Sequence, residues 1–319
     1  MDDQGSGADA HAWYHALLAR CAQLEPVATA VAHPCDAHAV AAVAEAAELG
    51  LIRPILVGPE AKIRQAAEAA QVDISAFEIE PAAHSHAAAA RAVELVRCGR
   101  ANLLMKGSLH TDELMSQVVA RDTGLRTERR ISHVYIMSLA DWPRPLLVTD
   151  AAINVAPSLL DKRDIVQNAI DLAQVMGIAE PKVAILSAVE TVNPALQSTL
   201  DAAALCKMSD RRQIVGGVLD GPLAFDNAIS EEAARDKGIV SAVAGRADVL
   251  VAPDLVSGNI LAKQLTFMNH ADAAGVVLGA KVPIILTSRA DAQSIRIASC
   301  AVAVLMAGRE VLKVRKAQP

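Results

Sequence analysis

Two short stretches of the chain combine a basic side chain with hydroxyl groups directly after a strand-like run. The first consists of Lys106, Gly107, Ser108, Leu109, His110 and Thr111. The glycine permits close approach of the backbone, two residues supply hydroxyl groups, and the lysine supplies an ammonium group. A helix is expected to begin here, and the N-terminus of a helix favours anions. The stretch therefore predicts a phosphate site, with the alternative that Thr111 or Asp112 simply caps the helix.

The second stretch contains Thr287, Ser288, Arg289, Ala290 and Asp291, and it follows the strand-like run 283–286. An arginine at the end of a strand can bind a phosphate or a carboxylate through two parallel hydrogen bonds. Asp291 lies two residues further on, where it can pair with Arg289 or cap the last helix. These residues favour a second anion contact, with a structural ion pair as the alternative.

Polar residues also follow the other strand-like runs of the chain. They are Thr149, Asp150, Asn154, Ser187, Glu190, Asp220, Asp254 and Asn259. Each of them alone is typical of a turn. In open parallel sheets, however, ligands bind beyond the carboxyl ends of the strands. Their shared placement predicts one cleft between the two halves of the chain.

The elements that must position these residues alternate along the chain. After an N-terminal segment expected to be mobile, β-like runs such as 54–58, 102–108 and 133–138 are each separated by helical patterns. This alternation predicts an α/β protein with an open, mostly parallel sheet. Two prolines in the stretch 141–145 predict a crossing between domains.

Composition and charge exclude several classes of function. The net charge of −6 provides no basic field for nucleic acid. No apolar run is long enough to span a membrane, and the start of the chain lacks the order of a signal peptide. The five cysteines are scattered, which is typical of reduced thiols, so we expect a cytoplasmic protein. The patterns GxxxxGK[ST], GxGxxG and GxSxG are absent.

Two histidine-containing clusters could suggest a metal site. His84 and His86 are separated by one residue at the start of a helix, so they point in different directions and a helix cap is favoured. In the stretch 33–36, Asp36 is expected to cap a helix and Cys35 to lie in the core. We assign no metal.

From about Val27 onward the sequence resembles the phosphate acetyl/butyryltransferase family. The resemblance rests on long, ordered motifs, including LMKGSLHTDELM, RRISHVYIMS, LLVTDAAINVAPSLLDKRDIVQNAIDLA, AILSAVETVNP, LDGPLAFDNAIS, ADVLVAPDLVSGNILAKQL and IILTSRAD. The KGSLHTDEL and TSRAD forms look closer to the butyryl-type branch, and to domains fused to hydratases, than to dedicated acetyl enzymes.

The resemblance implies a fold like that of isocitrate and isopropylmalate dehydrogenases, with two three-layer α/β/α domains and a cleft between them. Residues 1–143 and 286–319 would build one domain and residues 144–285 the other. It also implies a homodimer and a functional link to an enoyl-CoA hydratase. The implied reaction converts an acyl-CoA (acetyl to butyryl) and phosphate into an acyl phosphate and free coenzyme A. Coenzyme A is then a substrate, and no bound cofactor is expected.

Residues take their implied roles from the positions that match the family's motifs. Ser288 and Arg289 match its Ser-Arg pair, so Arg289 would neutralise the phosphoryl or carbonyl oxygen and Ser288 would orient it. The stretch from Lys106 to Thr111, including His110, matches the phosphate loop, and Asn259 would lie beside the cleft. The acetyl branch has a carboxylate where this chain has Gln293 and Ser294. Asp291 is therefore the expected aid to deprotonation of the thiol.

Three other functions compete with this interpretation, and the third of them is a related enzyme that transfers acyl groups between an acyl carrier and phosphate. A metal- and NAD-dependent decarboxylating dehydrogenase would need paired carboxylates where this chain has Asn259 and Lys263. A catalytically silent module that senses acyl-CoA is the second alternative, and the intact KGSLHT and Ser288-Arg289 elements argue against it.

Overall fold

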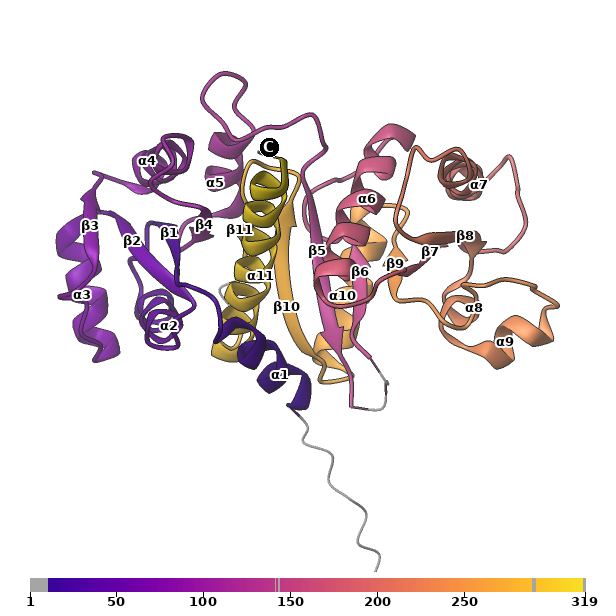
Figure 1. Ribbon diagram of the computed structural model, residues 1–319, viewed down its shortest axis with the longest axis horizontal. Coiled ribbons are helices and arrows are strands. Elements are labelled where there is room, and N and C mark those ends of the chain that lie inside the picture. Colours follow the sequence, from indigo (N-terminus) through magenta and orange to yellow (C-terminus); the bar gives the residue numbers. More distant parts are fainter. Residues whose placement is uncertain (1–10, 141, 143, 289–290, 318–319) are drawn as a thin grey trace, which may run out of the picture.

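The strands of the molecule form one continuous sheet with helices on both faces (Figure 1). The computed structural model describes residues 11–140, 142, 144–288 and 291–317. In spatial order the strands are β3 (Glu78–Pro81), β2 (Ile52–Gly58), β1 (Val27–Ala32), β4 (Leu103–Lys106), β11 (Ile284–Ile285), β10 (Asp272–Leu278), β5 (Ser132–Ser138), β6 (Leu146–Thr149), β9 (Val249–Val251), β7 (Lys182–Leu186) and β8 (Val218–Leu223).

The sheet is parallel in each half and antiparallel in the middle. The strands β3, β2, β1, β4 and β11 pair in parallel, as do β6, β9, β7 and β8. Between these halves, β10 is antiparallel to β11 and to β5, and β5 is antiparallel to β6. The two halves therefore run in opposite directions. The α/β class with a mostly parallel sheet is confirmed.

Helices follow most strands and cover the sheet. They are α1 (Ala12–Cys21), α2 (Ala37–Glu48), α3 (Glu60–Ala70), α4 (Ser85–Arg97), α5 (Thr111–Val118), α6 (Leu159–Val175), α7 (Gln197–Asp210), α8 (Phe225–Ile229), α9 (Glu231–Asp236), α10 (Leu255–Phe267) and α11 (Gln293–Ala317). None of the helices in the described ranges is long and apolar enough to cross a membrane.

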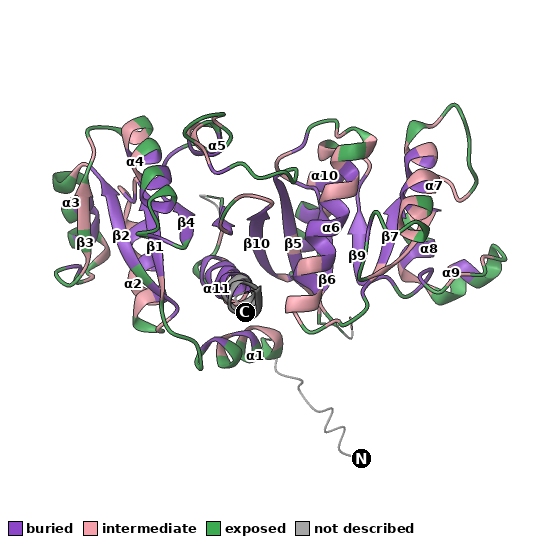
Figure 2. Ribbon diagram, turned by 45° about the horizontal axis from the view of Figure 1, so that its top comes forward, coloured by how far each residue is buried: buried purple, intermediate pink, exposed green. Residues whose placement is uncertain are grey.

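The apolar core differs between the two faces of the sheet. On one face, α1, α2, α3, α6, α7 and α11 share a single continuous cluster of buried side chains. On the other face, separate clusters lie under α4 and α5, under α10, and under α8 and α9. Figure 2 shows buried strands between helices whose outer surfaces are exposed. The interruptions on the second face leave room for cavities.

Helix caps agree with several sequence expectations. Asp36 accepts a hydrogen bond from the Ala39 amide at 2.8 Å, and the His84 ring accepts one from the Ala87 amide at 3.2 Å. Both residues cap helices, as expected.

The N-terminal segment, which we expected to be mobile, contains helix α1. Leu17 and Cys21 of this helix are buried, and the Cys21 thiol donates to the Ala301 carbonyl oxygen at 3.4 Å. The expectation of mobility was wrong for residues 12–21, because their apolar side chains pack against α11.

Candidate active site

A cavity of about 460 Å³ lies between α5 and α10 and contains side chains from both halves of the sheet. Its polar lining residues are Lys106, His110, Thr111, His133, Tyr135, Asn259, Thr287 and Ser288. Five of the residues expected from the sequence therefore share this cavity, namely Lys106, His110, Thr111, Asn259 and Ser288. They come from the end of β4, the loop and helix start that follow it, the first turns of α10 and the loop after β11.

Lys106 ends strand β4 and is only 4% exposed. Its Nζ donates to the carbonyl oxygens of Gly107 at 3.2 Å and Leu109 at 3.3 Å. The ammonium group lines the 460 Å³ cavity and also a neighbouring cavity of about 360 Å³. A buried cation held by backbone carbonyls is well placed to attract an anion into either space.

Gly107 and Ser108 face the smaller cavity rather than the larger one. A Cβ on Gly107 would come within 2.5 Å of the Ala32 carbonyl oxygen, so only glycine fits here. The Ser108 hydroxyl donates to the His33 carbonyl oxygen at 2.8 Å and accepts from the Cys35 amide at 3.1 Å. These contacts fix the loop against the end of β1 and orient Lys106.

Helix α5 begins at Thr111 without a hydrogen bond from a capping side chain. His110 occupies the N-cap position in an extended conformation, and His110 and Thr111 both line the cavity. The alternative that Thr111 or Asp112 serves as a conventional cap is therefore not observed.

The loop after β11 is held by Asp291, which lies just before α11, and by Arg296 in the first turn of that helix. The Ser288 amide donates to Asp291 Oδ2 at 2.6 Å, and Arg296 Nη2 donates to the Ser288 carbonyl oxygen at 3.0 Å. Burial raises the pKa of Asp291, while the hydrogen bond from Ser288 and the charges of Arg296 and Lys106 act in the opposite direction. Arg289 lies outside the described residues.

The opposite wall of the cavity is built by α10 against the loop after β6. Asn259 Nδ2 donates to the Ala151 carbonyl oxygen at 3.0 Å. A Cβ on Gly258 would clash with the Asp150 carbonyl oxygen, so the glycine permits this close contact. Asp150 itself is buried and accepts from the backbone amides of Ala152 at 2.9 Å and Asn154 at 3.2 Å. Its carboxylate thus organises the loop.

Three residues around the site were not expected from the sequence. His133 and Tyr135 line the 460 Å³ cavity, and Arg296 lines the 360 Å³ cavity. A signal existed for the first two, because His133 and Tyr135 occupy alternate positions of a strand and must point to the same face. Arg296 is 6% exposed, and its position one turn inside a helix gave no sign of its contacts.

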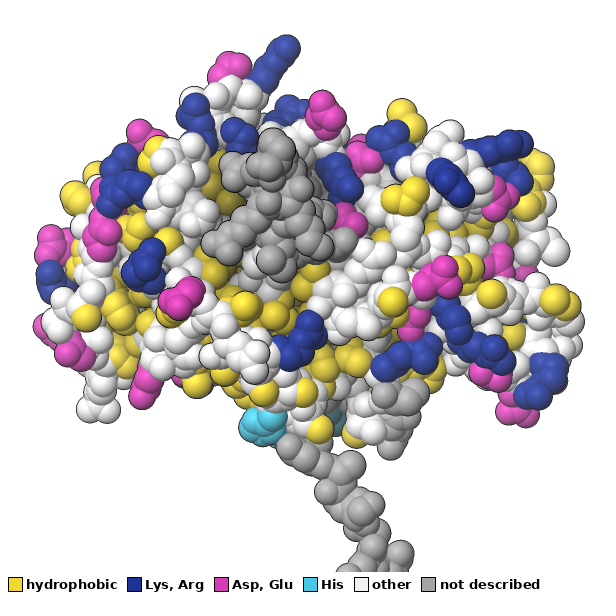
Figure 3. All heavy atoms as spheres, viewed as in Figure 1, with side chains coloured by type: hydrophobic (Ala, Val, Ile, Leu, Met, Phe, Trp, Pro, Cys, Tyr) yellow, Lys and Arg dark blue, Asp and Glu magenta, His cyan; other side chains and the backbone are white. Residues whose placement is uncertain are grey.

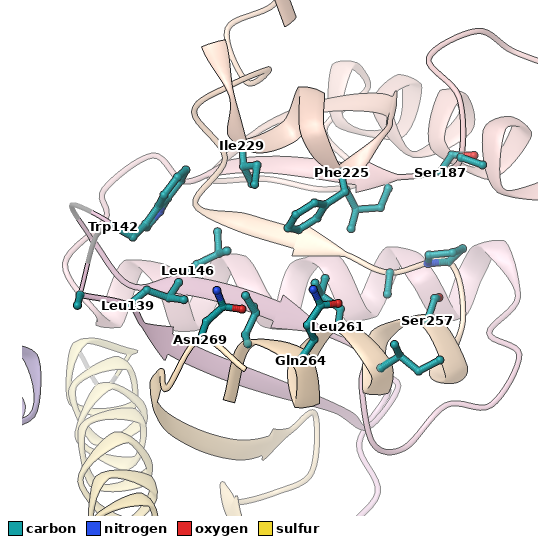
Figure 4. Close-up of a pocket in the computed structure, with 17 residues that line it drawn as sticks. Leu139, Trp142, Leu146, Ser187, Phe225, Ile229, Ser257, Leu261, Gln264 and Asn269 are labelled. Carbon is teal, nitrogen blue, oxygen red and sulfur yellow. The ribbon is translucent and has the colours of Figure 1, made fainter. Parts of the chain in front are cut away.

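A larger cavity lies elsewhere and has different chemistry. It measures about 830 Å³ and is bordered by the loop after β5, the end of β7, α8 and one side of α10. Figure 4 shows Trp142, Phe225 and Leu261 around it. None of the described residues that line it is ionisable. Proton transfer and phosphate binding therefore favour the smaller cavities. No cluster of three or more metal-binding side chains occurs in the described part of the chain.

Comparison with known proteins decides the family. Residues 84–304 match the sequence profile described as "Phosphate acetyl/butaryl transferase". The chain belongs to the phosphate acetyl/butyryltransferase family. This match includes both stretches that the sequence predicts to bind anions, 106–111 and 287–291.

Relatives named phosphate acetyltransferase and relatives named phosphate butyryltransferase both match this chain over almost their whole length. A phosphate acetyltransferase of Rhizobium meliloti is 62% identical over 93% of this chain and 94% of its own. A phosphate butyryltransferase of Clostridium beijerinckii is 42% identical over 92% of this chain and 97% of its own. The crystal structure of a branched-chain phosphotransacylase from Enterococcus faecalis superposes with a TM-score of 0.77 at 30% identity, covering 88% of this chain and 99% of that one. Family membership and fold thus agree.

Proposed function

We propose that this protein is a phosphate acyltransferase that exchanges a short acyl group between coenzyme A and phosphate. The observation that supports it best is the 460 Å³ cavity, where a buried lysine meets hydroxyl and amide groups from both halves of the sheet. Family membership supplies the reaction class. Acyl-CoA and phosphate are the substrates, and no bound cofactor is part of the proposal.

The proposed phosphate contacts are the Lys106 ammonium, the Thr111 hydroxyl and His110. Gly107 and Ser108 support them from the neighbouring cavity by fixing the loop. Asn259 would contact a substrate from the opposite wall. A phosphate dianion placed here loses part of its hydration, and the nearby ammonium offsets that cost.

The proposed reacting groups follow β11. Arg289 would neutralise charge on the reacting oxygen, and Ser288 would orient it. Asp291 would accept the proton that is exchanged with the thiol of coenzyme A. Burial raises the pKa of Asp291, which brings it nearer to the pKa of a thiol than the pKa of an ordinary aspartate is. If Arg289→Ala retained native turnover at saturating phosphate, this assignment of Arg289 would be excluded.

The wider organisation is part of the same proposal. Residues 1–143 with 286–319 would form one domain and residues 144–285 the other, with the substrates bound between them.

We also propose a cytoplasmic homodimer. It is supported by exposed apolar side chains along and just after α10, since Val256, Ile260, Phe267 and Met268 are 60% to 74% exposed. A functional link to an enoyl-CoA hydratase rests on the sequence resemblance alone.

The alternative functions make different experimental predictions. The decarboxylating dehydrogenase is not supported by the comparisons, and Asn259 and Lys263 occupy the positions where it would need carboxylates. An acyl-CoA sensor would bind coenzyme A without exchanging the acyl group. The test is to incubate the protein with acetyl-, propionyl- and butyryl-CoA and to follow thiol release with and without phosphate. Phosphate-dependent release supports the transferase and ranks the donors, whereas binding without release favours the sensor.

A further inference from the structure

His133 is a buried histidine whose ring has no hydrogen-bond partner among the described residues. The side chain is 0% exposed, and neither Nδ1 nor Nε2 forms a hydrogen bond. In the described part of the chain six buried side-chain atoms lack a partner, and three of them belong to His133 and Thr287. Both residues line the 460 Å³ cavity. Because buried polar groups are normally paired, these atoms point to hydrogen bonds made with a ligand that enters the cavity.

The surrounding strands make a specific place for the imidazole. Val134 and Ile136 belong to the core on one face of the sheet, so His133 and Tyr135 project to the other, where the cavity lies. The two rings contact edge to face, with centroids 4.3 Å apart. Gly275 on β10 provides the room, since a Cβ there would lie 2.8 Å from His133 Nε2.

The charge state of this ring decides which ligand it suits. Burial lowers the pKa of His133 to about 3, so the imidazole is neutral at neutral pH. A neutral imidazole offers one N–H donor and one acceptor. It adds no positive charge that would attract a phosphate dianion. In the proposed site that charge comes from the Lys106 ammonium group. It does suit an uncharged carbonyl oxygen on which negative charge develops only during reaction.

We propose that His133 is a further catalytic residue, whose ring N–H donates a hydrogen bond to the carbonyl oxygen of the acyl group at the floor of the cavity. The inference rests on the proposed phosphate acyltransferase activity. The Thr287 hydroxyl, also buried and unpaired, is the neighbouring donor for the same oxygen.

In the proposed step an oxygen of hydrogen phosphate attacks the thioester carbon. A carbon–oxygen bond forms, and the carbonyl electron pair moves onto the oxygen, where the imidazole N–H stabilises it. The electron pair then returns, the carbon–sulfur bond breaks, and the sulfur leaves with its bonding pair. The proton of hydrogen phosphate ends on that sulfur, and the imidazole keeps its own proton throughout.

The experiment measures the carbonyl stretch of an acyl-CoA labelled with ¹³C at the thioester carbon, bound without phosphate. In the native protein we expect this infrared band to lie below that of free acyl-CoA. In His133→Phe we expect the shift to disappear. Turnover should fall about 10²- to 10³-fold, the effect of removing one donor to a developing oxyanion. The KM for phosphate should change little, because the phosphate contacts remain.

Two kinds of variant separate chemistry from folding. His133→Asn and His133→Gln each place an amide N–H near one of the two ring nitrogens, so we expect one of them to recover part of the shift and of the turnover. His86→Phe is the matched control, because this exposed histidine lies outside the cavity. It should behave like the native protein in both measurements.

The outcomes distinguish this inference from the proposed function. Release of no coenzyme A by the native protein from any donor contradicts the proposed function itself. Normal release with an unshifted carbonyl band overturns only the role of His133. The same holds if His133→Phe keeps the shift or native turnover, which would mean that the ring nitrogens merely hold a water molecule.

Discussion

At the scale of single residues, Lys106 is the most informative side chain, since it is buried and borders both the 460 Å³ and the 360 Å³ cavity. Replacing it with methionine keeps the volume and removes the charge. We expect Lys106→Met to lower kcat/KM for phosphate by about 10²-fold, the usual scale for losing a group that stabilises transferred charge. Initial rates at varied phosphate test this, and the exposed Lys263→Met is the control. An unchanged kcat/KM would exclude Lys106 from the phosphate site.

Asp291 makes a prediction about pH. Burial raises its pKa, so the carboxylate forms at a higher pH than in an ordinary aspartate. If it is the base, activity rises with pH through this raised pKa, and Asp291→Asn loses that limb of the kcat profile. The pKa of Asp291 is higher in the folded protein than in the unfolded chain. Its contribution to the free energy of unfolding is therefore fully present below the pKa of the unfolded chain. That contribution is lost as the pH rises through the pKa of the folded protein. A variant with an unaltered profile would exclude Asp291 as the base.

The site could be predicted from the sequence only where polar residues follow strands. Lys106, Thr111 and Ser288 were found in this way and share the cavity. His133 was hidden, because a histidine inside an apolar run looks like part of the core until its unpaired nitrogens are seen. Arg296 was hidden because its partner, the Ser288 carbonyl oxygen, is a backbone atom whose position depends on the tertiary fold.

At the scale of elements, the close approach of α10 to the loop after β6 depends on Gly258. A methyl group there would clash with the Asp150 carbonyl oxygen. We expect Gly258→Ala to destabilise the protein by about 1–3 kcal/mol, the usual cost of overpacking. It should also reduce turnover, because Asn259 moves with the helix. Denaturant unfolding and initial rates test both effects.

A matched glycine provides the control for this prediction. At Gly308, also in a helix, a Cβ would meet only Leu24 Cδ1, at 4.0 Å. Gly308→Ala should therefore be neutral or stabilising by up to about 1 kcal/mol, because alanine favours helix. If both variants had the same stability, the clash at Gly258 would not control the packing of α10.

The alternation of elements was predictable because apolar runs and helical periods are local properties. The direction of the strands was not. β5, β6 and β10 look like ordinary buried strands in the sequence, yet their antiparallel pairing reverses the sheet at its centre. Short elements such as β3, α8 and α9 were also missed, since they contain too few residues to show a period.

At the scale of the whole molecule, the surface charges are mixed. Figure 3 shows basic and acidic side chains interspersed over one face, in keeping with a modest net charge of −6. We therefore expect phosphate attraction to depend on local groups such as Lys106 rather than on a general field. The surface instead offers an apolar feature, the exposed side chains of α10, as the basis for self-association.

The proposed dimer gives the last prediction. Ile260 is 60% exposed on α10, and the same helix carries Asn259 into the cavity. A charge buried without a partner in an apolar interface is costly, so we expect Ile260→Glu to convert the dimer into a monomer, as measured by light scattering. Val240→Glu is the control, because that side chain is 102% exposed and lies outside α10. A native protein that is already monomeric, or an Ile260→Glu variant that remains dimeric, would show that α10 is not the interface. Reduced turnover of the monomer would indicate in addition that the interface holds Asn259 in position.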